Sequence, residues 1–133
     1  MSQDITFTDN NIPVSAQFDD LYFSREGGLE ESRHVFLGGS NLPEAWEALE
    51  TIRICETGFG TGLNFLSACK LFSQTKTSGQ RLHYTAIEKF PLTRAQIETA
   101  LAPWKAELSP FLDKLLLHYP LDMPGFHPVV LRD

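Results

Sequence analysis

The sequence predicts an α/β fold in which parallel strands alternate with helices, and three observations lead to that prediction. A β-type run at 52–55 is followed by a glycine-rich turn and then by an apolar helical run. A second alternating strand pattern covers 82–88, after a polar loop. A further helical pattern follows at 91–101. Strands that alternate with helices in this way are typical of a parallel sheet.

Length, composition and charge set the broad class. The 133 residues correspond to one small domain, and 42% hydrophobic with 21% charged residues is ordinary globular usage. No apolar run approaches the roughly 20 residues of a membrane span, and the first four residues lack the basic and apolar regions of a signal peptide. We therefore expect a cytoplasmic protein without a membrane partner. The formal net charge of −6 argues against a broad nucleic-acid-binding surface on this chain.

The N-terminal segment, 1–50, precedes the first strand of the sheet. Short β-type runs at 5–7 and 14–15 flank a polar turn and predict a hairpin. The pattern at 28–37 predicts a helix that ends at a pair of glycines. Residues 43–50 predict a second short helix, with Trp46 and Leu49 on its apolar side.

The segment 51–133 carries the predicted sheet. We expect strands at 51–56 and 82–88, with Tyr84, Ala86 and Glu88 on one face of the second strand. Cys55 and Cys69 are expected to be buried, reduced thiols. Because doubly wound sheets need more than two strands, the segment reads as the first half of a Rossmann-like fold, with exposed edges that favour a homo-oligomer. The other expected elements are helices at 62–72, 91–101 and 108–119, a loop at 73–80 and the start of a strand at 129–131.

The most informative stretch is the turn after the first strand. It reads Glu56, one spacer, then Gly58, Gly60 and Gly62. Such a turn lets backbone N–H groups and a helix N-terminus meet a polar ligand at close range. In the dinucleotide fingerprint the third glycine comes one residue later, where Leu63 stands, and no Lys-Ser/Thr pair completes a phosphate-binding P-loop. The spacing resembles motif I of class I S-adenosylmethionine-dependent methyltransferases.

The chemistry of that cofactor explains the pattern. S-adenosyl-L-methionine has no phosphate, so a diphosphate cradle is unnecessary, whereas its ammonium group would be attracted by Glu56. An acid at the end of the second strand, Glu88, would bind the ribose hydroxyls, and the amide of Asn64 lies beside the loop. Plainer alternatives remain open at this point. The glycines can serve packing alone, Glu88 can be a solvated charge and Asn64 an ordinary first-turn residue.

Three segments together resemble the methyltransferase domain of the MnmC family. They are 19–39 (DDLYFSREGGLEESRHVFLGG), 56–65 (ETGFGTGLNF) and 88–93 (EKFPLT), in this order. Members are bifunctional bacterial enzymes that complete 5-methylaminomethyl-2-thiouridine at the tRNA wobble position. The resemblance implies methyl transfer from S-adenosyl-L-methionine to the exocyclic amine of 5-aminomethyl-2-thiouridine. It also implies a separate, C-terminal FAD-dependent domain that produces this amine.

The resemblance also assigns residues. Lys89 and Phe90 lie beside the ribose-binding Glu88, where adenine would pack, and Tyr22, Phe23, Ser24 and Glu30 belong to a segment expected to close over the methionine end. From the residues alone, Tyr22 and Phe23 could equally be core aromatics. Arg25, Arg33 and Lys89 lie within the matched segments and could contact tRNA phosphates. The residues that match the cofactor loop are Glu56, Gly58, Phe59, Gly60, Gly62 and Asn64.

One departure from the family concerns the reacting amine. The family carries an Asp-Gly-Phe segment whose aspartate is expected to contact this amine, and no such segment occurs here. We therefore name no catalytic residue and expect this part to be inactive alone, within a longer enzyme. The four histidines are scattered, so we name no metal site. The alternatives are a non-catalytic α/β interaction unit or dimer, and a nicotinamide- or flavin-binding protein, against which Leu63 argues.

Overall fold

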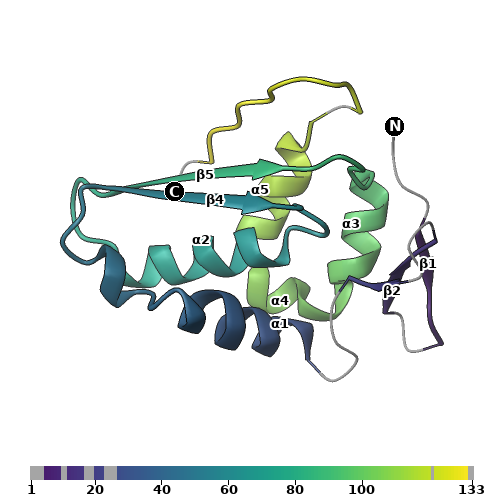
Figure 1. Cartoon of the computed structure of the whole chain (residues 1–133), viewed down its shortest axis with the longest axis horizontal. Helices are drawn as coiled ribbons and strands as arrows, with labels where there is room; N and C mark the ends of the chain where they lie inside the picture. The colour runs from purple at the N-terminus through teal and green to yellow at the C-terminus, as the bar shows by residue number, and fades with distance from the viewer. Residues whose placement is uncertain (1–4, 10–11, 17–19, 23–26, 121, 132–133) are drawn as a thin grey trace.

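Two parallel strands organise the computed structural model, which describes residues 5–9, 12–16, 20–22, 27–120 and 122–131. Strand β4 (Thr51–Thr57) pairs in parallel with β5 (Arg81–Ile87), residue by residue from one end to the other. Helix α2 (Leu63–Thr75) connects them and lies against one side of the pair (Figure 1). The predicted α/β class with a parallel sheet is thus confirmed.

The alternation of side chains along the strands gives the sheet one covered and one open face. On β4, Ile52 is buried and Glu56 half-buried, whereas Arg53 and Cys55 between them are exposed. The prediction that Cys55 is buried is therefore wrong, because this thiol lies on the face that α2 does not cover. Cys69, on α2, is largely covered, and both thiols are free.

The N-terminal segment forms the predicted hairpin. Strand β1 (Ile5–Phe7) pairs antiparallel with β2 (Pro13–Ser15), and β3 (Asp20–Leu21) adds a short third strand. The predicted helix at 28–37 is present, but only α1 (Gly28–Glu31) is α-helical, and η1 (Ser32–Gly38) is a π-helix.

The second short helix is a single 3₁₀ turn, η2 (Glu44–Trp46). Trp46 is buried, and its indole N–H donates to the Thr75 hydroxyl over 3.2 Å. Leu49, in contrast, is 48% exposed. Its predicted place on an apolar helix face is wrong, because the turn ends before the chain reaches it.

The helices after β5 contribute to the same hydrophobic core as α2. Helix α3 (Arg94–Leu101) begins later than predicted, because Thr93 and Gln96 form a capping box at its start. The predicted helix at 108–119 is interrupted, since Pro110 has no N–H and precedes α5 (Phe111–His118). The predicted strand at 129–131 is absent, and no strand of the described residues pairs with this stretch. The remaining elements are η3 (Ala102–Trp104) and α4 (Lys105–Leu108).

The hydrophobic core lies beside α2, at the end of the sheet where β4 and β5 finish. Burial of these side chains stabilises the fold by removing apolar surface from water. Among the described residues, no helix is long and apolar enough to cross a membrane. The core cluster comprises Leu29, Leu63, Leu66, Leu92, Ile97, Leu101, Leu108, Leu112 and Leu115.

Candidate functional site

The three glycines of the loop all adopt left-handed backbone conformations. Their φ angles are +82° at Gly58, +55° at Gly60 and +82° at Gly62. A Cβ atom on Gly62 would lie 2.8 Å from Cζ of Phe59 and 3.3 Å from Cδ2 of Leu115. Gly62 therefore serves close packing against the core. No atom lies within 4 Å of the corresponding position on Gly58, so the space there is open.

The backbone N–H groups of these glycines are bonded within the protein. Gly58 donates to the carbonyl of Ile87 over 2.7 Å, Gly62 to that of Phe59 over 3.0 Å and Gly60 to a carboxylate oxygen of Glu88 over 3.0 Å. These donors do not face a ligand, contrary to the expectation from the glycine pattern. A diphosphate cradle needs free N–H groups, and the glycines do not supply them.

Glu88 joins the end of β5 to the glycine loop. Its Oε2 atom accepts from Gly60 N–H, and its Oε1 atom accepts from Phe90 N–H over 2.8 Å. The plainer view of Glu88 as a freely solvated charge is wrong, because two backbone donors fix the side chain. A carboxylate offers about four lone-pair sites, so each oxygen keeps acceptor capacity for a ligand hydroxyl.

Glu56 is held in the same manner at the end of β4. Asn64 donates to its Oε1 atom over 2.9 Å, and the Tyr84 hydroxyl donates to its Oε2 atom over 2.6 Å. Burial raises the pKa of Glu56, the two hydrogen bonds oppose that rise, and the charge of Glu88 adds to it. Asn64 is thus no ordinary first-turn residue, since it links α2 to the strand-end acid.

Two aromatic side chains contact the glycine loop, Tyr22 at Gly60 and Phe59 at Gly62. The Tyr22 ring lies against Gly60, with Cδ1 3.5 Å from the position of a Cβ atom there. Burial, followed by the charge of Glu88, raises the pKa of Tyr22. Phe59 packs against Phe65, with ring centroids 5.9 Å apart, and against Tyr119 at 6.4 Å. Tyr22 and Phe59 therefore line the loop and also contact the core cluster.

The other predicted site residues lie further out or outside the described residues. Ser24 belongs to the latter group, together with Phe23 and Arg25. Lys89 is exposed, with Nζ 5.3 Å from the ring centroid of Phe90. Glu30, also exposed, forms an ion pair of 2.7 Å with Arg33.

Sequence reasoning missed two residues of this site, Tyr84 as a partner of Glu56 and Ser32 as a partner of Asn64. The Ser32 hydroxyl lies 2.7 Å from Oδ1 of Asn64. For Tyr84 there was a partial signal, because alternation places it on the same face as Glu88. Its contact with Glu56 depends on the register, which pairs Ile54 with Tyr84 and so places the tyrosine diagonally across from Glu56. For Ser32 there was none, because its contact is long-range.

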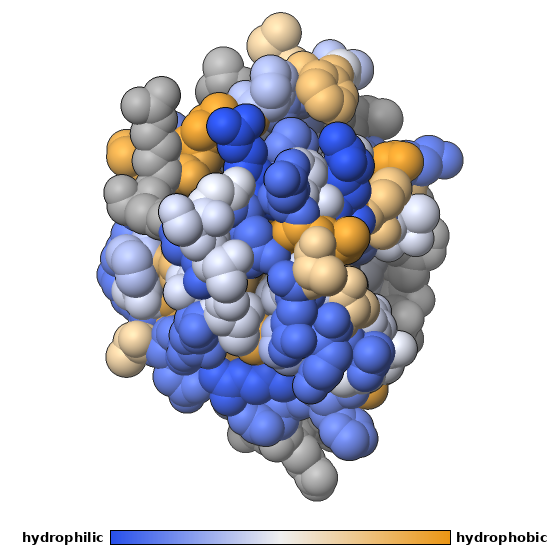
Figure 2. Space-filling model, turned by 90° about the vertical axis from the view of Figure 1, so that its left-hand side faces the viewer, coloured by the Kyte–Doolittle hydropathy of each residue, from blue (hydrophilic) through white to orange (hydrophobic). Residues whose placement is uncertain are grey.

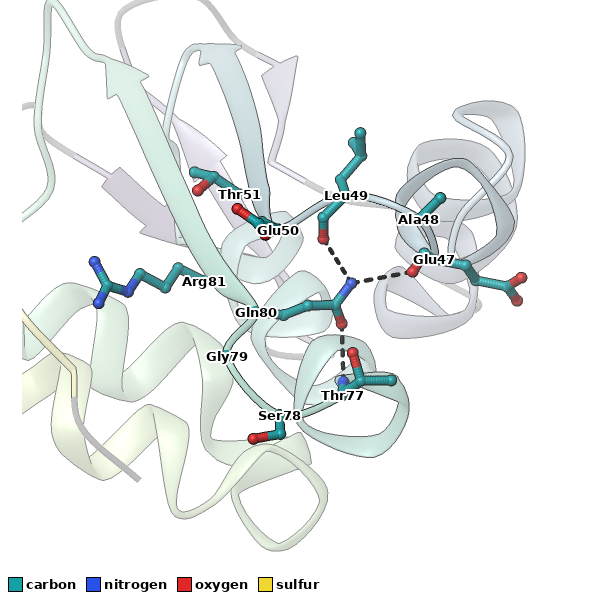
Figure 3. Close-up of a pocket in the computed structure, with 10 residues that line it drawn as sticks. All are labelled: Glu47, Ala48, Leu49, Glu50, Thr51, Thr77, Ser78, Gly79, Gln80 and Arg81. Carbon is teal, nitrogen blue, oxygen red and sulfur yellow. Dashed lines mark hydrogen bonds between the residues drawn. The ribbon is translucent and has the colours of Figure 1, made fainter.

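A hollow of about 500 Å³ lies at the opposite end of the strands, lined by 47–51 and 77–81 (Figure 3). The Gln80 amide spans it, donating to the carbonyls of Trp46, Glu47 and Leu49 over 3.1, 3.3 and 2.7 Å. The Glu47 and Arg81 side chains point away from that amide (Figure 3). We therefore regard this hollow as a place where neighbouring chain segments are held together. The candidate site is the glycine loop with Glu56 and Glu88.

The comparisons with known proteins show which proteins this chain is similar to. No family model matches the chain. Relatives named tRNA 5-methylaminomethyl-2-thiouridine biosynthesis bifunctional protein MnmC are similar to it. That of Vibrio campbellii is 43% identical over 98% of this chain and 20% of its own length. That of Chromobacterium violaceum is 50% identical over 90% of this chain and 18% of its own length. The chain thus spans about a fifth of the curated relatives that it matches.

A solved structure supports the same relationship. The crystal structure of MNMC2 from Aquifex aeolicus superposes with a TM-score of 0.55 at 25% sequence identity. The match covers 83% of this chain and 38% of that chain. Fold and sequence therefore point to the same relatives.

Proposed function

We propose, from the premise that this chain matches the N-terminal part of MnmC, that it binds S-adenosyl-L-methionine for a tRNA methyltransferase. The reaction is methylation of the aminomethyl group of 5-aminomethyl-2-thiouridine at the tRNA wobble position, as one activity of a longer bifunctional enzyme in the cytoplasm. FAD belongs to another part of that enzyme. In this proposal, 51–133 is the first half of a Rossmann-like methyltransferase fold, and 1–50 closes over the cofactor.

One observation carries the proposal. Two carboxylates, Glu56 and Glu88, end adjacent parallel strands beside a loop whose glycine N–H groups are already bonded. Acceptors with spare lone pairs suit an ammonium group and ribose hydroxyls. A diphosphate would instead meet two negative charges without glycine donors. The arrangement therefore favours S-adenosyl-L-methionine over a dinucleotide.

In this proposal the roles of Glu56, Glu88 and Asn64 rest on their hydrogen bonds, and those of Ser24, Lys89 and Phe90 on the resemblance to the family. Glu56 attracts the cofactor ammonium, with Asn64 beside it, and Glu88 accepts from the ribose. The open space over Gly58 admits the cofactor. Tyr22 covers the loop at Gly60, Lys89 and Phe90 lie towards the adenine, and Ser24 belongs to the closing segment.

Methyl transfer is an in-line displacement at a carbon that the positive sulfur has already activated. The protein mainly holds the amine about 3 Å from that carbon, in line with the leaving sulfur. The amine must be unprotonated, and a carboxylate suited in pKa and geometry would orient it and accept its proton. Glu56 and Glu88 are binding residues in this scheme, so we assign no catalytic residue and propose that this part is inactive alone.

Calorimetric titration with S-adenosylhomocysteine tests the proposal, with two glycine variants as a matched pair. Gly58 and Gly79 have φ angles of +82° and +87°, and neither has an atom within 4 Å of an added Cβ. Alanine at either position costs about 1–2 kcal/mol in backbone strain. Only Gly58→Ala should weaken cofactor binding, about tenfold or more for a clash with the ligand. Equal affinities of the two variants would mean that the cofactor does not bind at the glycine loop.

A second candidate function is a non-catalytic α/β interaction unit. It is favoured by the sheet face that α2 leaves open. Exposed side chains there include Cys55 and Ile87, the latter 64% exposed. Pairing through the open edges of β4 and β5 would give a homo-oligomer. Size-exclusion chromatography with light scattering separates the candidates, since a monomer that binds S-adenosylhomocysteine contradicts the interaction unit.

A further inference from the structure

We propose that Ser32 and Tyr84 are positioning residues, which hold the Asn64 amide and the Glu56 carboxylate in the arrangement that receives an ammonium group. The inference rests on the proposed function of this site and adds two residues to it. Neither is assumed to touch the cofactor. Each acts through one of the two groups already assigned to the site.

A continuous chain of hydrogen bonds crosses four elements of the fold. It begins at Ser32, the first residue of the π-helix η1, and passes to Asn64 in the first turn of α2 over 2.7 Å. From Asn64 it continues to Glu56 on β4 over 2.9 Å. It ends at Tyr84 on β5, whose hydroxyl lies 2.6 Å from Glu56. The position of the acid thus depends on the N-terminal segment as well as on the sheet.

The donors and acceptors allow one orientation of the Asn64 amide. An ionised Glu56 only accepts, so Asn64 must turn its NH₂ group towards it and its Oδ1 atom towards Ser32. The Ser67 hydroxyl donates to the carbonyl of Leu63 over 2.8 Å. The single Ser32 proton then goes to Asn64 at 2.7 Å, since the contact of Ser32 with Ser67 is longer, at 3.1 Å. The ionised Glu56 therefore sets which way the amide faces, and Ser32 anchors its Oδ1 atom.

Tyr84 holds the other carboxylate oxygen. Its ring packs edge-on against Phe65, with centroids 5.0 Å apart, which fixes the hydroxyl. Hydrogen bonds to a carboxylate favour its charged form, and those from Tyr84 and Asn64 lower the pKa of Glu56 against the effect of burial. Each Glu56 oxygen has one such donor and retains acceptor capacity. The network thus presents a charged acceptor with a fixed direction.

Two ligands separate ammonium recognition from binding of the nucleoside. S-adenosylhomocysteine carries the amino-acid end, and 5′-methylthioadenosine lacks it. Ser32→Ala and Tyr84→Phe should weaken the binding of S-adenosylhomocysteine about tenfold or more, because the misplaced Glu56 carboxylate would lose its charge-assisted hydrogen bond to the ligand ammonium. Both should leave the affinity for 5′-methylthioadenosine within about twofold, a change below 0.5 kcal/mol. Ser32→Thr, which keeps the hydroxyl, should restore binding.

Matched controls remove the same groups outside the network. Ser73→Ala deletes a hydroxyl on α2 that donates to the carbonyl of Lys70 over 2.7 Å, and Tyr119→Phe deletes a hydroxyl that donates to the carbonyl of Leu92 over 2.8 Å. Both controls should bind the two ligands as the unsubstituted protein does. If Ser32→Ala and Tyr84→Phe behave like these controls, the positioning role is wrong.

A second measurement needs no ligand. In carbon-detected NMR titration of the Glu56 carboxyl group, Tyr84→Phe should raise its pKa, whereas Tyr119→Phe should not. An unchanged pKa in Tyr84→Phe overturns the role of Tyr84 even where binding falls. Failure of the unsubstituted protein to bind either ligand would instead overturn the proposed function, and this inference with it. The two failures are therefore distinguishable.

Discussion

The two ends of the β4–β5 pair use polar groups in opposite ways. At the carboxyl end, Glu56 and Glu88 each accept two hydrogen bonds and retain further acceptor capacity beside an open glycine. At the amino end, a hollow of about 500 Å³ is crossed by the Gln80 amide, which joins neighbouring backbone segments. Charged groups that converge and can still accept hydrogen bonds indicate a candidate binding site. The volume of a hollow alone does not.

At the amino end, the hollow lies where the Gln80 amide links two backbone segments by hydrogen bonds. Gln80 donates to the carbonyls that follow the 3₁₀ turn and accepts from Thr77 N–H over 2.9 Å. Figure 2, which shows the molecule from this side, displays a mostly hydrophilic surface with small, separate hydrophobic areas. Such a surface lacks the apolar lining that is usual in small-molecule pockets.

The largest loss of stability should come from Gly62 at the carboxyl end, with Gly79 at the amino end as its comparison. Gly62→Ala should destabilise the protein by about 2–5 kcal/mol, because its Cβ atom would meet Phe59 and Leu115 in addition to the left-handed strain. Gly79→Ala, at the amino end, should cost only about 1–2 kcal/mol, since no atom lies near its Cβ position. Urea unfolding measures both. Equal losses would show that the packing around Gly62 adjusts freely.

A smaller effect should separate stability from binding. Gln80→Ala should lower the free energy of unfolding by about 1–3 kcal/mol, because its backbone partners lose an amide. It should leave the affinity for S-adenosylhomocysteine unchanged. Glu88→Gln should weaken binding about tenfold, through loss of the charged acceptor, and should also lower stability, because its NH₂ group cannot accept from the backbone N–H of Gly60 or Phe90. Unfolding and calorimetry on both variants test this difference, and a binding loss in Gln80→Ala would contradict it.

The difference between the ends also explains what the sequence could predict. The strands and the two acids followed from period-two alternation and from the spacing after the glycines, which are local properties. The bonds of the glycine N–H groups did not, because they depend on the register between β4 and β5. Ser32 escaped prediction since its partner lies 32 residues away. Cys55 was misplaced because alternation gives two faces without showing which one helices cover.

The smallest effect should be a dependence of stability on pH at the carboxyl end. Burial raises the pKa of Glu56 above its ordinary value of 4.5. An acid with a raised pKa in the folded state contributes stability that is fully present below pH 4.5 and lost as pH rises through the raised value, because the unfolded chain releases its proton first. The contribution is modest, since the group is half-exposed.

Two variants isolate that contribution. Glu56→Gln should abolish this part of the decline in unfolding free energy between about pH 4 and 7, because no proton is released there. Tyr84→Phe should deepen the decline, since the lost hydrogen bond favours the charged form of Glu56. Urea unfolding across this range measures both slopes. Parallel curves for the three proteins would mean that Glu56 is solvated like an ordinary surface acid, and the contrast between the two ends would then rest on Glu88 alone.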